Sequence, residues 1–259
     1  MFFIIFVFPK DKMILRSAFI FFTIILTSYI NATPIKKLID GVTYYIVEAN
    51  YNSVKIIWKD SKGHQLHTFS EVGRYLLKQG YTAKTLMNGG IFEPGWIPTG
   101  LLIQNGKVIR PINRRKGEGN FYLKPNGIFM ITSKGASVID AAEDRYRKDK
   151  IHYAVQSGPM LLKNAKVHPA FNANSKSRLH RNGVGILRNG KVVFAMTDTK
   201  SAKFPNLYEF SQLFRQLGCE NALFLDGNIS QMKSGRNIFK ANSNLGAVIA
   251  IVGTNKKDN

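Results

Sequence analysis

Ala222-Leu223-Phe224-Leu225-Asp226-Gly227-Asn228 is the stretch around which the rest of the sequence can be interpreted. Four apolar residues run directly into an acid and a glycine. The run is too short for a helix and has no polar alternation, which predicts a buried strand. Asp226 then stands where the strand leaves the core, and Gly227 permits a sharp turn. Because ligand sites in open α/β sheets lie at the carboxyl ends of strands, Asp226 is a candidate site residue; a simple turn cap is the alternative.

A second stretch, Thr85-Leu86-Met87-Asn88-Gly89-Gly90-Ile91-Phe92, has the same order of residue types. It predicts a short apolar strand that ends in a polar residue and two glycines, and a helix-like segment precedes each of the two strands. We therefore expect both strand-end loops to face one cleft, with Asn88, Gly89 and Gly90 close to Asp226 and Gly227.

The beginning of the 259-residue chain has the pattern of a secretory signal peptide. Basic residues at positions 10, 12 and 16 precede an apolar run over 18–26, and small residues follow up to Ala32. We predict a signal peptide over 1–32, one domain over 33–259, and a secreted or periplasmic location. The apolar run is short for a membrane span. An uncleaved anchor is the only membrane contact we expect, and a true start at Met13 is an alternative.

The formal net charge of +21 favours anionic partners such as phosphates, acidic glycans or lipid head groups. The lysines are scattered through loops rather than clustered with aromatic residues, so we expect no specific nucleic-acid site. Cys219 is the single cysteine, so no internal disulfide can form and the core alone must stabilise the fold.

Hairpins are the commonest predicted feature between these landmarks. Asn-Gly pairs at 105–106, 126–127 and 189–190 each lie between apolar runs, which is a strong hairpin signal. Amphipathic helices are predicted from Thr68 or Ser70 to Gly80 and over 206–217, with a short surface helix over 135–150. Strands are predicted over 42–47, 54–58, 85–87, 101–103, 108–109, 121–123, 128–131, 153–155, 160–162, 183–187, 192–196, 222–226 and 245–252. The fold class is thus α/β in the broad sense (α+β), a single compact domain with a mixed, largely antiparallel sheet and two or three packed helices.

Several familiar catalytic motifs are missing from the sequence. It has no paired-cysteine zinc pattern, no phosphate-binding loop ending in Gly-Lys-Ser/Thr and no Gly-x-Ser-x-Gly elbow. A nucleophilic Ser157 is not expected, because Val155 stands where an elbow requires glycine. His180 could serve as a general acid or phosphate ligand, but a solvated loop histidine is the favoured interpretation.

Four polar loops that adjoin strands carry the remaining chemistry: 88–90, 156–159, 177–183 and 226–228. Glycine-rich loops expose backbone N–H groups that can hold an anion. Arg178 and Arg181 can bind phosphate through two parallel hydrogen bonds, and Asp226 supplies a carboxylate. This combination suits hydrolysis of a phosphorylated substrate, with Glu93 as a possible second carboxylate.

The ordered set of motifs resembles the phosphodiester glycosidase family, and most closely its bacterial exported branch. The motifs are Asn88-Gly89-Gly90-Ile91-Phe92, Asn120-Phe121-Tyr122 with Pro125-Asn126-Gly127, Gln156-Ser157-Gly158-Pro159-Met160-Leu161, Arg181-Asn182-Gly183-Val184-Gly185 and Leu225-Asp226-Gly227. The resemblance covers roughly residues 40–253 and implies cleavage of the C1–O bond of a sugar-1-phosphodiester in a phosphorylated glycan. After Asp226-Gly227 the family often has more glycine and serine, where this chain has Asn228-Ile229-Ser230.

Site roles follow from the loops and the resemblance together. We expect Asp226, Asn88 and Arg181 to be catalytic. Substrate binding is expected from Gly89, Gly90, Gln156, Ser157, Gly158, Arg178 and Gly227. We expect no cofactor, and the sequence assigns no metal ligand. The alternative function is a non-catalytic module that binds anionic glycans of the cell envelope, in which Asp226 would only hydrogen-bond sugar hydroxyls.

Overall fold

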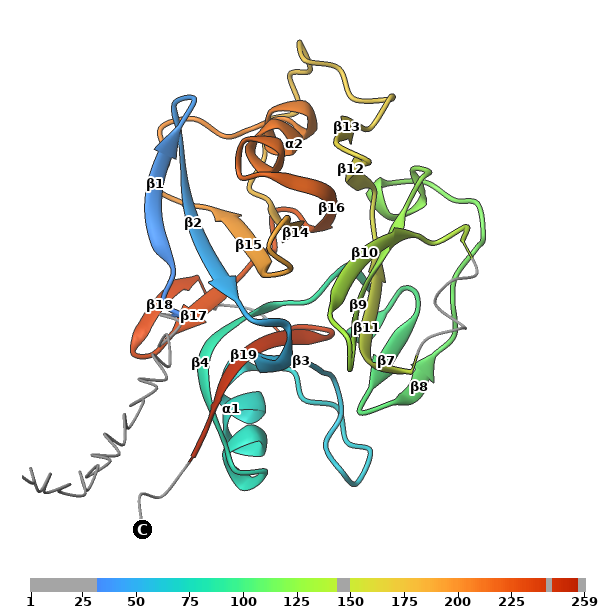
Figure 1. Cartoon of the computed structure of the whole chain (residues 1–259), viewed down its shortest axis with the longest axis vertical. Helices are drawn as coiled ribbons and strands as arrows, with labels where there is room; N and C mark the ends of the chain where they lie inside the picture. Colours follow the sequence, from blue (N-terminus) through green and yellow to red (C-terminus); the bar gives the residue numbers. More distant parts are fainter. Residues whose placement is uncertain (1–31, 144–149, 241–243, 256–259) are drawn as a thin grey trace, which may run out of the picture.

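The computed structural model describes residues 32–143, 150–240 and 244–255. Three larger sheets meet around the middle of the molecule, as the ribbon in Figure 1 shows, and a two-stranded ribbon completes the set. The first sheet has the order β1-β2-β15-β14-β16-β12-β13, formed by Ile35–Ile39, Val42–Ala49, Val192–Thr197, Asn182–Leu187, Cys219–Asp226, Met160–Lys163 and Lys166–Val167. The second has the order β10-β9-β11-β7-β8, formed by Ala136–Asp140, Gly127–Thr132, Ile151–Ser157, Leu102–Gln104 and Lys107–Arg110.

The third sheet has the order β18-β17-β4-β19-β3, formed by Asn237–Lys240, Met232–Ser234, Tyr81–Asn88, Val248–Thr254 and Val54–Ile57. The short ribbon pairs β5 (Phe92–Glu93) with β6 (Ile97–Pro98). Every strand pairing among the described residues is antiparallel, so the expected mixed, largely antiparallel sheet is in fact several antiparallel sheets.

The chain passes between sheets at short, defined junctions. A 3₁₀ turn, η1 (Tyr51–Ser53), separates β2 in the first sheet from β3 in the third. Gly158 and Pro159 separate β11 in the second sheet from β12 in the first. The main core lies where the three sheets face each other. There, Phe129 of the second sheet packs edge-on against Phe194 of the first, with ring centroids 5.9 Å apart, and Met87 of the third joins the same cluster.

Both principal helices begin and end where the sequence predicts. The helix α1 (Phe69–Lys78) packs on β4, and α2 (Leu207–Gln216) packs on β12 and β16. Each begins with a capping box, Thr68 with Glu71 and Asn206 with Glu209, in which the cap side chain accepts from the N3 backbone N–H and the glutamate accepts in return. In Figure 1 the two helices lie at opposite ends of the molecule.

Two predicted elements are wrong. Residues 121–123 are not a strand: Asn120–Tyr122 forms a 3₁₀ turn, η2, and Asn126 Nδ2 donates to Phe121 O at 2.9 Å, which closes a local loop. The helix predicted over 135–150 is, in its described part, the strand β10. Its neighbours Val138 and Ile139 pack into two different apolar clusters, as expected for a strand covered on both faces. The remainder of that prediction, 144–149, lies outside the described residues.

The predicted signal peptide also lies outside the described residues, apart from Ala32. Within the part of the chain that the structure describes, no helix is long and apolar enough to cross a membrane.

Candidate active site

Three strand ends bring together a buried group of amide and carboxylate side chains. Asn88 is the last residue of β4, Asp226 is the last of β16, and Asn182 is the first of β14 and lies opposite Asp226 in the sheet. Asn88 Nδ2 donates to Asp226 Oδ2 at 2.9 Å, and Asn182 Nδ2 donates to Asn88 Oδ1 at 2.8 Å. The structure thus forms a hydrogen-bonded chain Asn182–Asn88–Asp226 across two sheets, which confirms that the loops after β4 and β16 meet.

Backbone N–H groups complete the coordination of this chain. Gln231 N donates to Asn88 Oδ1 at 2.9 Å, and Gly227 N donates to Asp226 Oδ1 at 2.7 Å. Asp226 is 6% exposed, whereas Asn88 and Asn182 are almost fully buried. Both Asp226 oxygens therefore accept hydrogen bonds, which fixes the orientation of a carboxylate that still reaches the surface.

Gly89, Gly90 and Ser157 lie beside this group. Ser157 Oγ donates to Leu225 O at 3.0 Å, which ties the end of β11 to the residue before Asp226. Gly90 has a φ of 137°, and a Cβ there would lie 3.2 Å from Val155 Cγ2; a Cβ on Gly89 would lie 3.2 Å from Ala247 O. Small residues are thus needed where these loops approach each other. The hydroxyl of Ser157 points to the backbone carbonyl of Leu225.

Gln156 and Gly158 have structural contacts instead of facing the group. Gln156 is buried, and its Oε1 accepts from Leu101 N at 3.0 Å and from Asn113 N at 2.9 Å. A Cβ on Gly158 would lie 2.5 Å from the Asn126 Cβ, so glycine is required for packing there. The structure supplies these reasons for the Gln-Ser-Gly-Pro motif, and none of them involves a ligand.

The Arg181 guanidinium is bound by backbone carbonyls and forms no ion pair with Asp226 in the described part of the chain. Its neighbour Asn182 points to Asn88, and adjacent residues of an extended chain point to opposite faces. Arg181 is 1% exposed; its Nε donates to Pro205 O and its Nη2 to Ser177 O, both at 3.0 Å, and its guanidinium lies 5.7 Å from the Phe224 ring centroid. Burial lowers the pKa of Arg181 to about 10. Its contacts hold two loops against the start of β14.

Arg178 is also engaged within the protein. Its Nη1 and Nη2 donate to the two carboxylate oxygens of Glu209 at 2.5 and 3.1 Å, and Lys203 Nζ lies 3.1 Å from Glu209 Oε1. Burial raises the pKa of Glu209, but these hydrogen bonds outweigh burial and leave the pKa below its ordinary value. Arg178 is thus paired with a carboxylate, whereas Arg181 donates through Nε and Nη2 to backbone carbonyls and its buried Nη1 donates to no described residue.

His180 is buried, contrary to the solvated histidine that the sequence favoured. It is 6% exposed, and its Nε2 lies 3.2 Å from Ser230 O, in the loop that follows Asp226. Two buried atoms near this loop, Asn182 Oδ1 and Ser230 Oγ, make no hydrogen bond to any described residue. Because buried polar atoms are normally paired, these two are candidates for contacts with a ligand.

Comparison with known proteins places this geometry in a family. The model of the phosphodiester glycosidase family matches residues 81–248. This stretch runs from the first residue of β4 to the first residue of β19 and contains Asn88, Asn182 and Asp226. The chain belongs to the phosphodiester glycosidase family.

Individual relatives agree with this membership. Uncharacterized protein YigE of Escherichia coli strain K12 is 35% identical over 193 residues, which are 74% of this chain and 73% of that protein. The catalytic domain of zebrafish N-acetylglucosamine-1-phosphodiester alpha-N-acetylglucosaminidase, auto-inhibited by its pro-peptide, has a TM-score of 0.62 at 15% identity, covering 84% of this chain and 81% of that one. A candidate exported protein of Burkholderia pseudomallei K96243 has a TM-score of 0.52 at 11% identity, covering 81% of this chain and 74% of that one. The two solved structures show the shared fold.

In this member of the phosphodiester glycosidase family, three site residues were missed by sequence reasoning. Asn182 was assigned to the end of a polar loop, although it directly precedes the apolar strand residues 183–187 and belongs to a family motif. Ser230 and Gln231 carry no local signal, since Gln231 contributes its backbone N–H.

Glu93, the possible second carboxylate, lies on β5, and its Oε1 is 3.6 Å from Arg115 Nη2.

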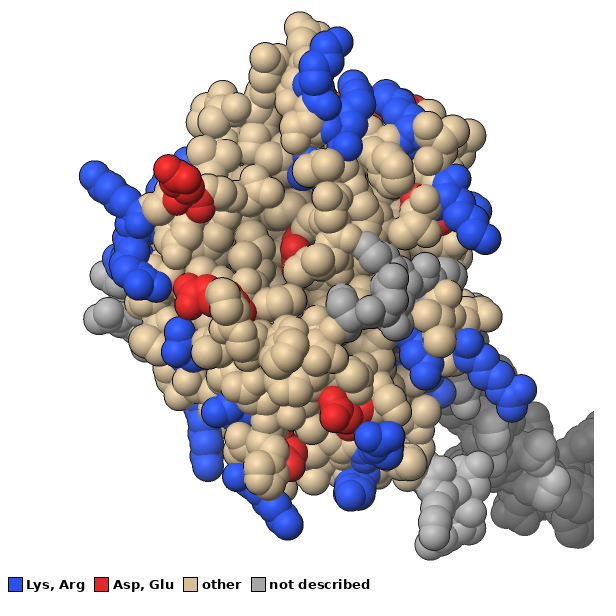
Figure 2. Space-filling view, turned by 180° about the vertical axis from the view of Figure 1, so that it is seen from behind, with Lys and Arg blue, Asp and Glu red and all other residues tan. Residues whose placement is uncertain are grey.

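The arrangement offers this phosphodiester glycosidase family member one carboxylate that is oriented by an amide side chain and a backbone N–H. Within residues 32–143, 150–240 and 244–255, no three His, Cys, Asp or Glu side chains are grouped as metal ligands. On the face seen in Figure 2, Lys and Arg side chains stand mainly around the outline, and most of the hollowed middle is uncharged. An oriented carboxylate of this kind can act as a base towards water or stabilise a positively charged sugar ring.

Proposed function

We propose that this family member is a hydrolase that cleaves the C1–O bond of a sugar-1-phosphodiester. The observation that carries the proposal is the buried chain Asn182–Asn88–Asp226, which orients one carboxylate at the meeting point of two sheets. The family assignment supports the same class of chemistry, and the name of the zebrafish neighbour describes cleavage at a sugar phosphodiester.

The proposed reaction needs one carboxylate rather than two. Water attacks C1 of the sugar, the C1–O bond breaks, and its electron pair leaves with the phosphate monoester. The proton of the attacking water passes to Asp226 and then to solvent. Ordinary glycoside hydrolysis uses a second carboxylic acid to protonate the leaving oxygen. A phosphate monoester is already a good leaving group, so this demand is weaker.

Neutral groups of the site take the remaining roles in this proposal. The buried Ser230 hydroxyl donates a hydrogen bond to a phosphate oxygen, and Asn182 Oδ1 accepts one from a sugar hydroxyl. Arg181 holds the loops at Ser177 and Pro205 in place in this proposal. The substrate is thus a phosphorylated glycan or a smaller sugar-1-phosphodiester, with no specific nucleic acid as a partner.

Export belongs to the same proposal. The basic, apolar and small-residue order of residues 10–32 supports cleavage after Ala32 and a secreted or periplasmic enzyme. One structural neighbour is named as a candidate exported protein. N-terminal sequencing of the protein from culture medium or periplasm tests this; a chain with residues 1–32 intact in the membrane fraction would contradict it.

The test of the activity uses p-nitrophenyl diesters of several sugar 1-phosphates. Cleavage at C1–O releases p-nitrophenyl phosphate, which becomes coloured after added alkaline phosphatase. We expect Asp226→Asn to lower kcat by at least about a hundredfold, the usual scale for general acid–base catalysis. Glu93→Gln is the matched control and should stay within about threefold of wild type.

A folded Asp226→Asn protein is required for this comparison. The new amide keeps one acceptor oxygen, so it cannot accept from both Asn88 Nδ2 and Gly227 N as the carboxylate does. Circular dichroism and a melting temperature therefore accompany each kinetic measurement. Near-normal kcat in folded Asp226→Asn would remove Asp226 from the mechanism. Binding of the diesters by wild type without product release would favour the glycan-binding module.

A further inference from the structure

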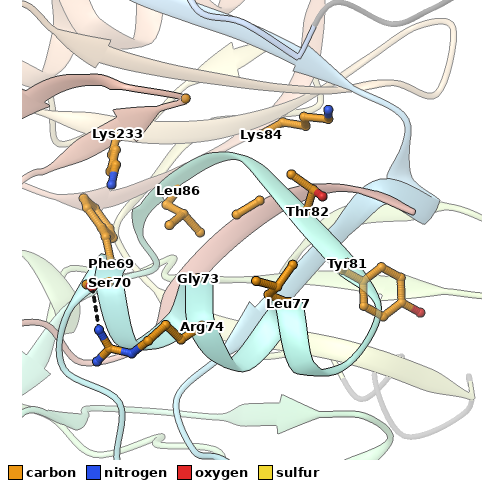
Figure 3. A pocket seen from close by; sticks show the side chains of 12 residues that line it. Phe69, Ser70, Gly73, Arg74, Leu77, Tyr81, Thr82, Lys84, Leu86 and Lys233 are labelled. Carbon is orange, nitrogen blue, oxygen red and sulfur yellow. Dashed lines mark hydrogen bonds between the residues drawn. The ribbon is translucent and has the colours of Figure 1, made fainter. Parts of the chain in front are cut away.

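A hollow of about 300 Å³ lies between α1 and the strands β4 and β17. Figure 3 shows its side chains. The apolar part is made by Phe69 and Leu77 of α1 and by Leu86 of β4. We call this hollow, with its lining, the α1 groove.

Three cationic side chains from three elements line the α1 groove. They are Arg74 of α1, Lys84 of β4 and Lys233 of β17, and Figure 3 shows the Lys233 side chain extending toward Phe69. The described lining includes no carboxylate. Arg74 Nη1 donates to Ser70 Oγ at 2.9 Å, and neither lysine forms an ion pair with a carboxylate of the described residues. The groove is thus positively charged without an internal counterion.

Exposed apolar side chains accompany these charges. Leu77 is 58% exposed on α1, and Ile238 of β18, which lies opposite Lys233 in the sheet, is 62% exposed. Large apolar side chains beside lysine and arginine are typical of surfaces that lie in a membrane interface, where the apolar groups enter the acyl boundary and the cations meet lipid phosphates. A groove for a neutral small molecule would not need three cations.

The N-terminal segment enters the fold close to the same strands. Thr85 Oγ1, between two groove residues of β4, donates to Ala32 O at 2.6 Å on the other face of that strand. The apolar run of the sequence ends at Leu26, and the six residues up to Ala32 can span at most about 20 Å. Packed layers in a protein lie roughly 10 Å apart, so a segment of this length can reach across about two layers. When the apolar run is in a membrane during export, the α1 groove is therefore within reach of that membrane.

We propose that the α1 groove is a docking surface for the anionic head groups of a phospholipid membrane. Arg74, Lys84 and Lys233 contact lipid phosphates, and Leu77 enters the interface between head groups and acyl chains. The contact does not depend on the proposed hydrolase activity. It would keep the exported protein at the membrane surface after the N-terminal segment has been removed.

The experiment compares two triple variants of the full-length gene product, purified from the cells that export it in whatever processed form they make. The groove variant is Arg74→Gln/Lys84→Gln/Lys233→Gln. The control is Lys107→Gln/Lys134→Gln/Lys166→Gln, which removes the same charge from exposed positions in β8, in the turn between β9 and β10, and in β13. Binding is measured by co-sedimentation with vesicles of phosphatidylcholine alone or with about one-third phosphatidylglycerol.

Each basic residue near an anionic membrane contributes about a factor of five to binding. We expect the groove variant to bind anionic vesicles about a hundredfold more weakly than wild type, and the control less than threefold more weakly. Added salt should weaken wild-type binding. Leu77→Ser, which keeps all charges, should weaken it about tenfold.

Two results would overturn the proposal. One is groove-variant binding equal to wild type, and the other is an equal loss in both triple variants, which would show a response to net charge alone. Melting temperatures of all variants exclude unfolding as the cause of any loss. The hydrolase assay, performed on the same samples with soluble substrate, should be unchanged in the groove variant whichever result is found.

Discussion

Replacing Asn88 tests the hydrogen-bonded chain most severely, because this side chain makes contacts in three directions. It donates to Asp226 Oδ2 at 2.9 Å and accepts from Asn182 Nδ2 at 2.8 Å and from Gln231 N at 2.9 Å. Asn88→Ala removes all three. Asn182 retains its 3.2 Å bond to the backbone oxygen of residue 88, so the main losses fall on Asp226 and on the Gln231 N–H.

The expected magnitude follows from these contacts. A hydrogen bond to a charged group contributes about 1.5–3 kcal/mol, and a buried N–H left without an acceptor costs about 1–3 kcal/mol. We expect Asn88→Ala to lower the free energy of unfolding by about 3–5 kcal/mol and the Tm by roughly 10 °C or more for a domain of this size. Asn221→Ala is the control: it removes one exposed hydrogen bond, from Asn164 N, and should cost at most about 1 kcal/mol.

Asn88→Asp adds a test of direction, since it places a second carboxyl group against Asp226. Two adjacent carboxylates cannot both ionise cheaply, so one pKa of the pair rises above its ordinary value of about 4. When the pKa is raised in the folded state, the stability of the variant relative to wild type is highest below the ordinary carboxyl pKa of about 4. Its relative stability then falls as the pH rises through the raised pKa.

Urea unfolding of wild type and the Asn88 variants at pH 4, 5, 6 and 7 measures both effects. The reasoning is refuted if Asn88→Ala unfolds within about 1 kcal/mol of wild type. It is also refuted if the stability difference between Asn88→Asp and wild type is independent of pH. Either result would mean that the chain Asn182–Asn88–Asp226 does not hold the two sheets together.

Three other predictions concern the residues around the site. Arg181→Lys should lower the free energy of unfolding by about 1–3 kcal/mol, because a contact to a backbone carbonyl is lost, and leave KM for a diester within about threefold of wild type. A large rise in KM at unchanged stability would instead indicate that Arg181 contacts the substrate phosphate. The pKa of Glu209 is lowered in the folded protein, so its ion pairs stabilise the fold above the ordinary carboxyl pKa and this stabilisation is lost as the pH falls through the lowered pKa. Acid should therefore destabilise Glu209→Gln less than wild type, as measured by urea unfolding at pH 7 and pH 3. Gly185→Ala places a Cβ 2.6 Å from Cys219 Sγ and should cost about 1–3 kcal/mol, part of which Cys219→Ala recovers; unchanged unfolding would contradict it.

The sequence predicts the backbone of the site well. Asn88 and Asp226 each follow a short apolar run, and glycines after both runs indicate sharp turns. Runs of this kind become buried strands, so their polar ends must emerge from the core. The structure confirms that these two ends meet, although they lie 138 residues apart.

The directions of side chains were predicted less well. Arg181 and Asn182 are neighbours, and the sequence alone does not show which of them faces Asp226. The register of β14 against β16 shifts between Asn182 and Gly183, and that tertiary detail decides it. Val138 and Ile139 misled for a related reason: two adjacent apolar residues fit a helix face as well as a strand buried on both sides.

Isotope labelling tests the central claim most directly. Wild-type enzyme hydrolyses a sugar-1-phosphodiester in H₂¹⁸O, and mass spectrometry then locates the label in the products. Attack of water at C1 predicts ¹⁸O in the free sugar and none in the phosphate monoester, and folded Asp226→Asn should form both products at least about a hundredfold more slowly. Label found in the phosphate would show that the P–O bond is broken instead and would contradict the proposed glycosidase chemistry.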